Sequence, residues 1–126
     1  MSFNWLNYLT LAEHLMDHVT SLPDEEACYR SIVSRAYYAV YCQIRNYVQD
    51  TDGTIFSHNP HSELQNYLQK HPHCLRKSIG NRLEMLRDHR NQADYDNQLQ
   101  GSIRRKAGLA LKLARKITQT LDELSA

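Results

Sequence analysis

Apolar residues recur along this chain at steps of three and four, which is the spacing of one face of an α-helix. The clearest case lies past the middle, where Leu75, Ile79, Leu83 and Leu86 follow one another at such steps. The strict alternation of apolar and polar residues that is typical of half-buried strands is absent, and only four glycines and three prolines interrupt the pattern. The sequence therefore predicts an all-α fold.

Five segments carry this helical periodicity, and breaks rich in Pro, Gly, Asp or Asn separate them. We predict helices over residues 3–20, 24–47 (with Asp24 as the N-terminal cap), 61–70, 74–95 and 99–124. A chain of 126 residues, 41% of them hydrophobic, suits a single domain with one core over residues 1–126. We therefore expect an antiparallel up-and-down bundle of four long helices plus a short helix.

The second predicted helix carries two unlike faces. Its core stripe is mostly aliphatic and consists of Tyr29, Val33, Ala36, Val40, Ile44 and Tyr47. The opposite arc is basic and aromatic and consists of Arg30, Ser31, Ser34, Arg35, Tyr38, Tyr41 and Arg45. An aromatic patch of this size is unusual on the surface of a small domain, so we predict that this arc serves a binding site or an interface. Packing and base stacking both suit its tyrosines and the neighbouring Tyr37.

The charge of the chain is concentrated locally. A formal net charge of +1 provides no overall attraction for anions, so an anion site needs clustered arginine. Residues 87–95 hold such a cluster, and helical spacing places Arg90 between Leu83 and Leu86 on the buried stripe. An unpaired charge away from water costs several kcal/mol. Arg90 must therefore meet a carboxylate, which Asp94 one turn later can supply, or a second subunit or an anionic ligand.

The cysteines and the N-terminal segment indicate a cytoplasmic protein. Cys28 and Cys42 would lie about 21 Å apart along one helix, and Cys74 is left alone, so we expect three reduced thiols. No apolar run is long enough to span a membrane. The opening residues MSFNWLNYL lack the basic start and the small-residue cleavage site of a signal peptide.

Histidine and cysteine gather in the two central loops. The residues concerned are His58, His61, His71, His73 and Cys74. Their spacing matches no closed zinc pattern, so we predict no metal site and no cofactor.

Three sequence features occur together in an order that resembles a known family. They are Ser34-Arg35-Ala36-Tyr37-Tyr38-Ala39 in the second helix, a loop histidine before the short helix, and Arg90-Asn91-Gln92-Ala93-Asp94-Tyr95 after a leucine-rich turn. Together they resemble the HEPN superfamily, and more narrowly its small stand-alone bacterial and archaeal members with an Arg-x-x-Ala-Asp-Tyr motif. The resemblance covers nearly the whole chain.

The resemblance implies a homodimer in which the motif helices of two subunits meet and form a positively charged cleft. We expect the interface to use the motif helix and the tyrosine-arginine arc of the second helix. Many HEPN proteins are metal-independent endoribonucleases, and several are toxins paired with a small nucleotidyltransferase antitoxin. The resemblance therefore implies an RNA-cleaving toxin or defence protein. The alternative is a non-catalytic HEPN module that binds a nucleotide, RNA or a nucleotidyltransferase partner.

The usual motif of this family is an arginine, a polar residue, three to five further residues and then a histidine. Arg90 and Asn91 match its start, but Tyr95 stands at the histidine position. A phenol with a pKa of about 10 is a poor general base at neutral pH, which keeps the non-catalytic alternative open. His89, on the same helix face as Arg82 seven residues earlier, is a possible substitute. The candidate catalytic residues are thus Arg90, Asn91, His89 and Tyr95, and the candidate substrate-binding residues are Arg35, Tyr38, Arg82, Arg87 and Asp94.

Overall fold

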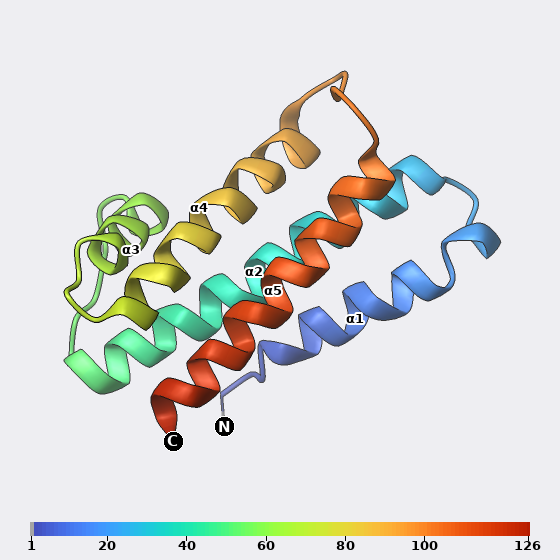
Figure 1. The fold of residues 1–126 in the computed structure, drawn as a ribbon. Coiled ribbons are helices and arrows are strands. Elements are labelled where there is room, and N and C mark those ends of the chain that lie inside the picture. Colours follow the sequence, from blue (N-terminus) through green and yellow to red (C-terminus); the bar gives the residue numbers. More distant parts are fainter. Residues whose placement is uncertain (1) are drawn as a thin grey trace.

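The computed structural model describes residues 2–126, and its regular structure is helical throughout. Its elements are helix α1 (Leu6–Asp17), the 3₁₀ turn η1 (Val19–Ser21), and helices α2 (Glu25–Asp52), α3 (Pro60–Gln69), α4 (Cys74–Tyr95) and α5 (Ile103–Ser125). Successive long helices run in opposite directions, and the short α3 lies at one end of the bundle beside α4 (Figure 1). The all-α prediction and the arrangement of four long helices and one short helix are confirmed for this part of the chain.

Helix α2 is the central element of the bundle. It packs against α1, α4 and α5, while α3 packs mainly on α4 (Figure 1). The largest fully buried side chains include Tyr37, Ile32, Ile44, Leu64, Leu68, Ile79, Leu83, Leu86 and Ile117. Tyr41, which the sequence places on the basic arc, is buried as well, whereas Tyr38 is half-buried. The prediction that the tyrosines form a surface patch is therefore wrong for Tyr41, because α3 and α4 cover much of this arc of α2.

Helix α2 extends five residues beyond its predicted end. The sequence predicts a break at Asp50-Thr51-Asp52-Gly53, but the helix continues to Asp52. Gly53 then ends it in a left-handed conformation (φ 69°) and donates its N–H to the Gln49 carbonyl. The extra turn is stabilised from outside the helix, because Arg76 of α4 binds the Asp52 carboxylate.

Buried Arg76 and the carboxylate of Asp52 form a clamp between α4 and α2. Arg76 Nη1 lies 2.6 Å from Asp52 Oδ2, and Nη2 lies 2.9 Å from Oδ1. Nη2 also donates to Tyr47 Oη at 3.2 Å, and Tyr67 of α3 donates its hydroxyl proton to Asp52. The hydrogen bonds from Arg76, helped by that from Tyr67, lower the pKa of Asp52 to about 2. The clamp ties three helices together and pairs both carboxylate oxygens.

The first and last helices begin later than predicted. Helix α1 begins at Leu6, where Asn4 Oδ1 accepts the Leu6 N–H, and it is interrupted at His18 before η1. Helix α5 begins at Ile103 rather than near residue 99, because Gly101 adopts a left-handed conformation (φ 79°) and Ser102 caps the helix.

All three cysteines are free, as predicted; Cys28 and Cys42 are buried and Cys74 is exposed. Burial raises the pKa of the Cys28 and Cys42 thiols, which keeps them protonated at neutral pH. Over residues 2–126, no helix is both long enough and apolar enough to cross a membrane.

Candidate functional site

Arg90 lies on the buried face of α4, as the helical spacing predicts. Only 7% of it is exposed, and the core residues Leu83 and Leu86 precede it on the same face. Its guanidinium lies over the rings of Tyr37 and Tyr38 of α2, with distances of 4.8 Å and 5.3 Å to the ring centroids. The negative faces of both rings compensate in part for the hydration that the buried cation has lost.

The hydrogen-bonding groups of Arg90 are incompletely used. Its Nη1 lies 3.9 Å from Asp94 Oδ2, beyond hydrogen-bonding distance, and the same oxygen accepts from Ser34 Oγ at 3.3 Å. The buried Nε of Arg90 has no hydrogen-bond partner among residues 2–126. The sequence predicts an ion pair between Arg90 and Asp94, and the structure contains it. At 3.9 Å the two groups are too far apart for a hydrogen bond, so Asp94 does not satisfy the guanidinium donors.

Arg76 shows how a structural arginine is held in this chain. It is as buried as Arg90, at 7% exposed, but Asp52 binds it through two hydrogen bonds and Tyr47 through a third. A donor that is buried without a partner costs about 1–3 kcal/mol. Because the Nε of Arg90 has no such partner within the subunit, that residue is the better candidate for binding an anion.

Arg87, one turn before Arg90 on α4, faces the same region. It is half-buried, and its Nε likewise has no partner in the described chain. It lines a small cavity of about 130 Å³ together with Asn59, Pro60, His61 and Ser62. Two guanidinium groups with unused donors therefore lie near one another, on the side of α4 that faces α2 and α3.

His61 of α3 completes the group of residues that we call the Arg90 cluster: Arg87, Arg90, Tyr37, Tyr38 and His61. His61 Nδ1 lies 2.6 Å from Tyr37 Oη. Burial lowers the pKa of His61, and the charges of Arg90 and Arg87 lower it further. Burial raises the pKa of Tyr37 well above its ordinary value. A neutral phenol and a neutral imidazole are therefore hydrogen-bonded beside two cations at pH 7.

Comparison with protein-family models identifies the family of this chain. The model described as HEPN domain matches residues 8–124, which is nearly the whole chain. The chain belongs to the HEPN domain family. Comparisons with curated proteins and with solved structures gave no match. The resemblance inferred from the sequence motifs is thus confirmed at the level of the family.

In this HEPN domain, His89 and Arg82 lie apart from the Arg90 cluster. Residues two positions apart on an α-helix are separated by about 200°, so His89 and Arg87 lie on opposite edges of α4. His89 faces α5, where burial and the charge of Lys106 lower the pKa of its imidazole. Arg82 shares that edge, as its spacing from His89 predicts. The structure therefore keeps His89 and Arg82 on one edge of α4, as the spacing predicts, and brings neither residue to Arg87 and Arg90.

Three other predicted site residues lie outside the Arg90 cluster. Tyr95 is the last residue of α4 and is 74% exposed. Asn91 is half-buried on the edge of α4 that carries Arg87. Arg35 faces α1, where its guanidinium lies 5.1 Å from the centroid of the Tyr8 ring. Of the predicted site residues, the structure thus brings together Arg87, Arg90, Tyr38 and Asp94.

Three residues at the site are not among the candidate catalytic and substrate-binding residues predicted from the sequence. Ser34 and Tyr37 stand in the Ser-Arg-Ala-Tyr-Tyr-Ala motif, but only the structure shows that they contact Asp94 and His61. The sequence suggests His61 only as one of five scattered candidate metal ligands. One feature of the sequence could have pointed to His61. Proline favours the first position of a helix, so Pro60 places His61 in an ordered first turn rather than in a loop.

The other loop histidines have structural contacts. His71 Nδ1 accepts the His73 N–H at 3.1 Å, and His73 Nδ1 caps α4 by accepting the Leu75 N–H at 3.2 Å. Nowhere in residues 2–126 do three or more His, Cys, Asp or Glu side chains converge into a group that could hold a metal ion.

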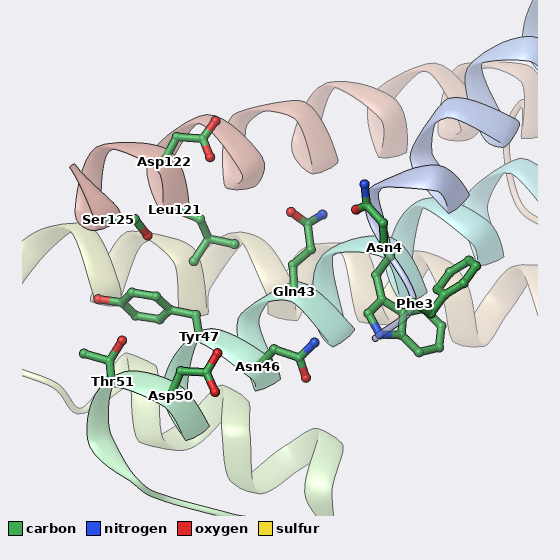
Figure 2. Close-up of a pocket in the computed structure, with 11 residues that line it drawn as sticks. Phe3, Asn4, Gln43, Asn46, Tyr47, Asp50, Thr51, Leu121, Asp122 and Ser125 are labelled. Carbon is green, nitrogen blue, oxygen red and sulfur yellow. The ribbon is translucent and has the colours of Figure 1, made fainter. Parts of the chain in front are cut away.

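A larger cavity, of about 400 Å³, lies elsewhere in this HEPN domain (Figure 2). The N-terminal segment, the second half of α2 and the end of α5 line it. Figure 2 shows the carboxylates of Asp50 and Asp122 at this cavity, and none of the described lining residues is an arginine or lysine. Its charge does not suit an RNA phosphate, and no predicted site residue lines it.

Proposed function

We propose that this HEPN protein binds RNA at the Arg90 cluster and cleaves it without a metal ion, in a cleft where two subunits meet. The observation that carries the proposal is the buried Arg90, whose Nε has no partner while its guanidinium rests on two tyrosine rings. Arg87 adds a second unpaired donor. An RNA phosphate suits both, because a guanidinium binds phosphate oxygens through two parallel N–H groups. We place this activity in the cytoplasm, in a toxin or defence role.

The proposed reaction transfers the 2′-hydroxyl oxygen of RNA onto the adjacent phosphorus. The P–O2′ bond forms and the P–O5′ bond breaks, which gives a 2′,3′-cyclic phosphate and a free 5′-hydroxyl. A general base takes the 2′-hydroxyl proton, and the leaving 5′-oxygen gains a proton. Negative charge grows on the non-bridging oxygens, where Arg90 and Arg87 would stabilise it.

We expect RNA cleavage to persist in EDTA. Purified protein incubated with tRNA and with an mRNA transcript should release cyclic-phosphate fragments at the same rate with and without chelator, because arginines supply the positive charge. Denaturing gels of end-labelled RNA measure this rate. Loss of cleavage in EDTA that a divalent ion restores would overturn the metal-independent mechanism.

A homodimer is part of the proposal. The solvent-facing side of α4 exposes Met85 and Tyr95, on the helix that also carries Arg90. Large side chains exposed on this helix suit contact with a second copy. Tyr41 is buried within the subunit and adds nothing to this exposed surface.

We expect the protein to be a dimer at roughly tens of micromolar, where an interface of standard size is occupied. Met85→Glu should produce a monomer, because it places a charge in the proposed contact. Leu109→Glu is the matched control, since it changes an exposed apolar residue of α5 and should leave the dimer intact. Size-exclusion chromatography with light scattering distinguishes the two states. A monomeric wild type, or a dimer that withstands Met85→Glu, would contradict this interface.

A second candidate function is a non-catalytic HEPN module that binds RNA, a nucleotide or a nucleotidyltransferase. Tyr95 favours it, since this residue stands at the histidine position of the family motif and is largely exposed rather than held in the Arg90 cluster. An exposed phenol is accessible to a partner enzyme such as a nucleotidyltransferase antitoxin. RNA that is bound but not cleaved in the chelation experiment would favour this second function.

A further inference from the structure

We propose that His61 is the acid–base residue of this site, in place of the histidine of the family motif, and that Tyr37 is its positioning residue. The inference rests on the proposed function, since it names the group that takes the 2′-hydroxyl proton. Its basis is geometric: the Tyr37 hydroxyl holds the imidazole, which lines the same cavity as Arg87.

The imidazole of His61 is held from two sides. Its Nδ1 lies 2.6 Å from Tyr37 Oη, and Tyr37 is wholly buried. Its ring stacks on Tyr41 with a centroid distance of 4.1 Å and an angle of 18° between the ring planes. A histidine that is oriented through one ring nitrogen presents the other in a defined direction, which is how catalytic histidines are commonly positioned.

The second ring nitrogen of His61 is available. Nε2 makes no hydrogen bond to the described residues, and half-buried His61 lines the cavity of about 130 Å³. This volume is several times the roughly 30 Å³ that a water molecule occupies, so a hydroxyl group can enter. When the Nδ1 proton is donated to Tyr37 Oη, Nε2 carries the lone pair and can accept a proton.

The surroundings of His61 favour the neutral imidazole that a general base requires. The titratable and charged groups that face it are Tyr37, Tyr38 and Tyr41 from α2 and Arg87 and Arg90 from α4. None of them is a carboxylate, and the two cations disfavour a third positive charge. A phosphate attracted by the same arginines would bring its adjacent 2′-hydroxyl toward the imidazole.

The alternative bases fit this position less well. His89 lies on the opposite edge of α4 and faces α5. His58, in the loop before α3, is exposed. Tyr37 is excluded as the base, because burial makes its phenol harder to ionise than an ordinary tyrosine.

In the proposed step, Nε2 of His61 takes the 2′-hydroxyl proton as O2′ bonds to phosphorus. The P–O5′ bond breaks, and the imidazolium returns the proton to the departing 5′-oxygen, directly or through water. Neutral His61 is thereby restored, and no co-reactant is consumed.

The test uses the full chain in EDTA with an end-labelled RNA oligonucleotide, and with the same oligonucleotide carrying 2′-O-methyl riboses to measure binding alone. We expect His61→Gln to lower cleavage by roughly a hundredfold or more, the scale of losing general acid–base help. Affinity for the methylated RNA and the melting temperature should stay near the wild-type values. His58→Gln, a matched change in the preceding loop, should cleave at the wild-type rate.

Two further measurements separate a chemical role from a structural one. Added imidazole should restore part of the activity of His61→Ala, which it would not do if His61 only supported the fold. Tyr37→Phe keeps the buried ring and should lower cleavage by roughly tenfold, the scale of losing an orienting hydrogen bond. It should also shift the acid limb of the pH–rate profile, which in the wild type should lie below about pH 6.5, the ordinary pKa of histidine.

Wild-type cleavage by a folded His61→Gln protein would overturn the inference and leave the proposed function standing. Loss of cleavage in His89→Gln but not in His61→Gln would do the same. Weaker RNA binding by His61→Gln with unchanged turnover of bound RNA would also overturn it, since His61 would then be a binding group. A wild type that cleaves no RNA would overturn the proposed function and the inference together.

Discussion

Arg90→Ala should lower RNA cleavage by roughly a hundred- to a thousandfold, the usual effect of removing a group that stabilises charge in the transition state. The change removes the cation that Tyr37 and Tyr38 hold in place. The chain should remain folded, because Asp94 keeps its hydrogen bond from Ser34 and its side chain is 27% exposed. Cleavage of end-labelled RNA in EDTA measures the effect, and circular dichroism reports folding.

Two variants control this experiment. Arg90→Lys keeps the charge but loses the planar pair of donors, so its activity should fall between those of the wild type and Arg90→Ala. Arg104→Ala removes an exposed arginine of α5 and should leave the rate unchanged. Full cleavage by a folded, dimeric Arg90→Ala protein would refute the site assignment.

Asp52→Ala should lower the free energy of unfolding by about 2–3 kcal/mol, the cost of leaving the charged donors of Arg76 without their acceptor at a site that water partly reaches. The side chains of Arg76 and Asp52 are 8% and 17% exposed, so water replaces the lost carboxylate poorly. Arg76 would lose two hydrogen bonds, and the Tyr67 hydroxyl would lose its acceptor. Urea unfolding followed by circular dichroism measures the difference.

A surface ion pair provides the matched control for the clamp. Glu13 and Arg115 approach to 3.4 Å, but both are well exposed, so Glu13→Ala should cost at most about 1 kcal/mol. The double change Asp52→Leu with Arg76→Met should recover much of the lost stability, because no unpaired charge remains. An Asp52→Ala protein no less stable than Glu13→Ala would show that the clamp is not a major stabilising contact.

The same clamp makes part of the stability depend on pH. Asp52 has a pKa of about 2 in the folded chain and about 3.9 when unfolded, so the unfolded state binds the proton more readily. The stability that ionised Asp52 contributes is fully present above the pKa of the unfolded chain, and it is lost as the pH falls toward 2. Between about pH 4 and pH 2, the wild type should therefore lose more stability than Asp52→Asn.

The amino-acid sequence by itself determined the helical class, the helical segments and the burial of Arg90. These features follow from local rules, because the spacing of apolar residues sets which side of a helix is buried. Arg90 falls on the side of Leu83 and Leu86 whichever helix packs there. The family was likewise recognisable from short motifs, since each lies within a single helix or loop.

The end of α2 shows where local rules stop being sufficient. Asp50-Thr51-Asp52-Gly53 has the composition of a helix break, yet the helix continues to Asp52. The stabilising partner, Arg76, lies 24 residues further along the chain. Tertiary contacts of this kind routinely override local propensity.

Only the tertiary structure decided which polar groups meet. Arg76 and Arg90 are both buried on α4, yet the first meets a carboxylate and the second meets two tyrosine rings. His61 contacts Tyr37 across 24 residues of sequence, whereas His89, the neighbour of Arg90, faces α5. Helical periodicity defines the direction of a side chain around its own helix axis. The group that it faces depends on how the helices pack around α2, and no local pattern contains that information.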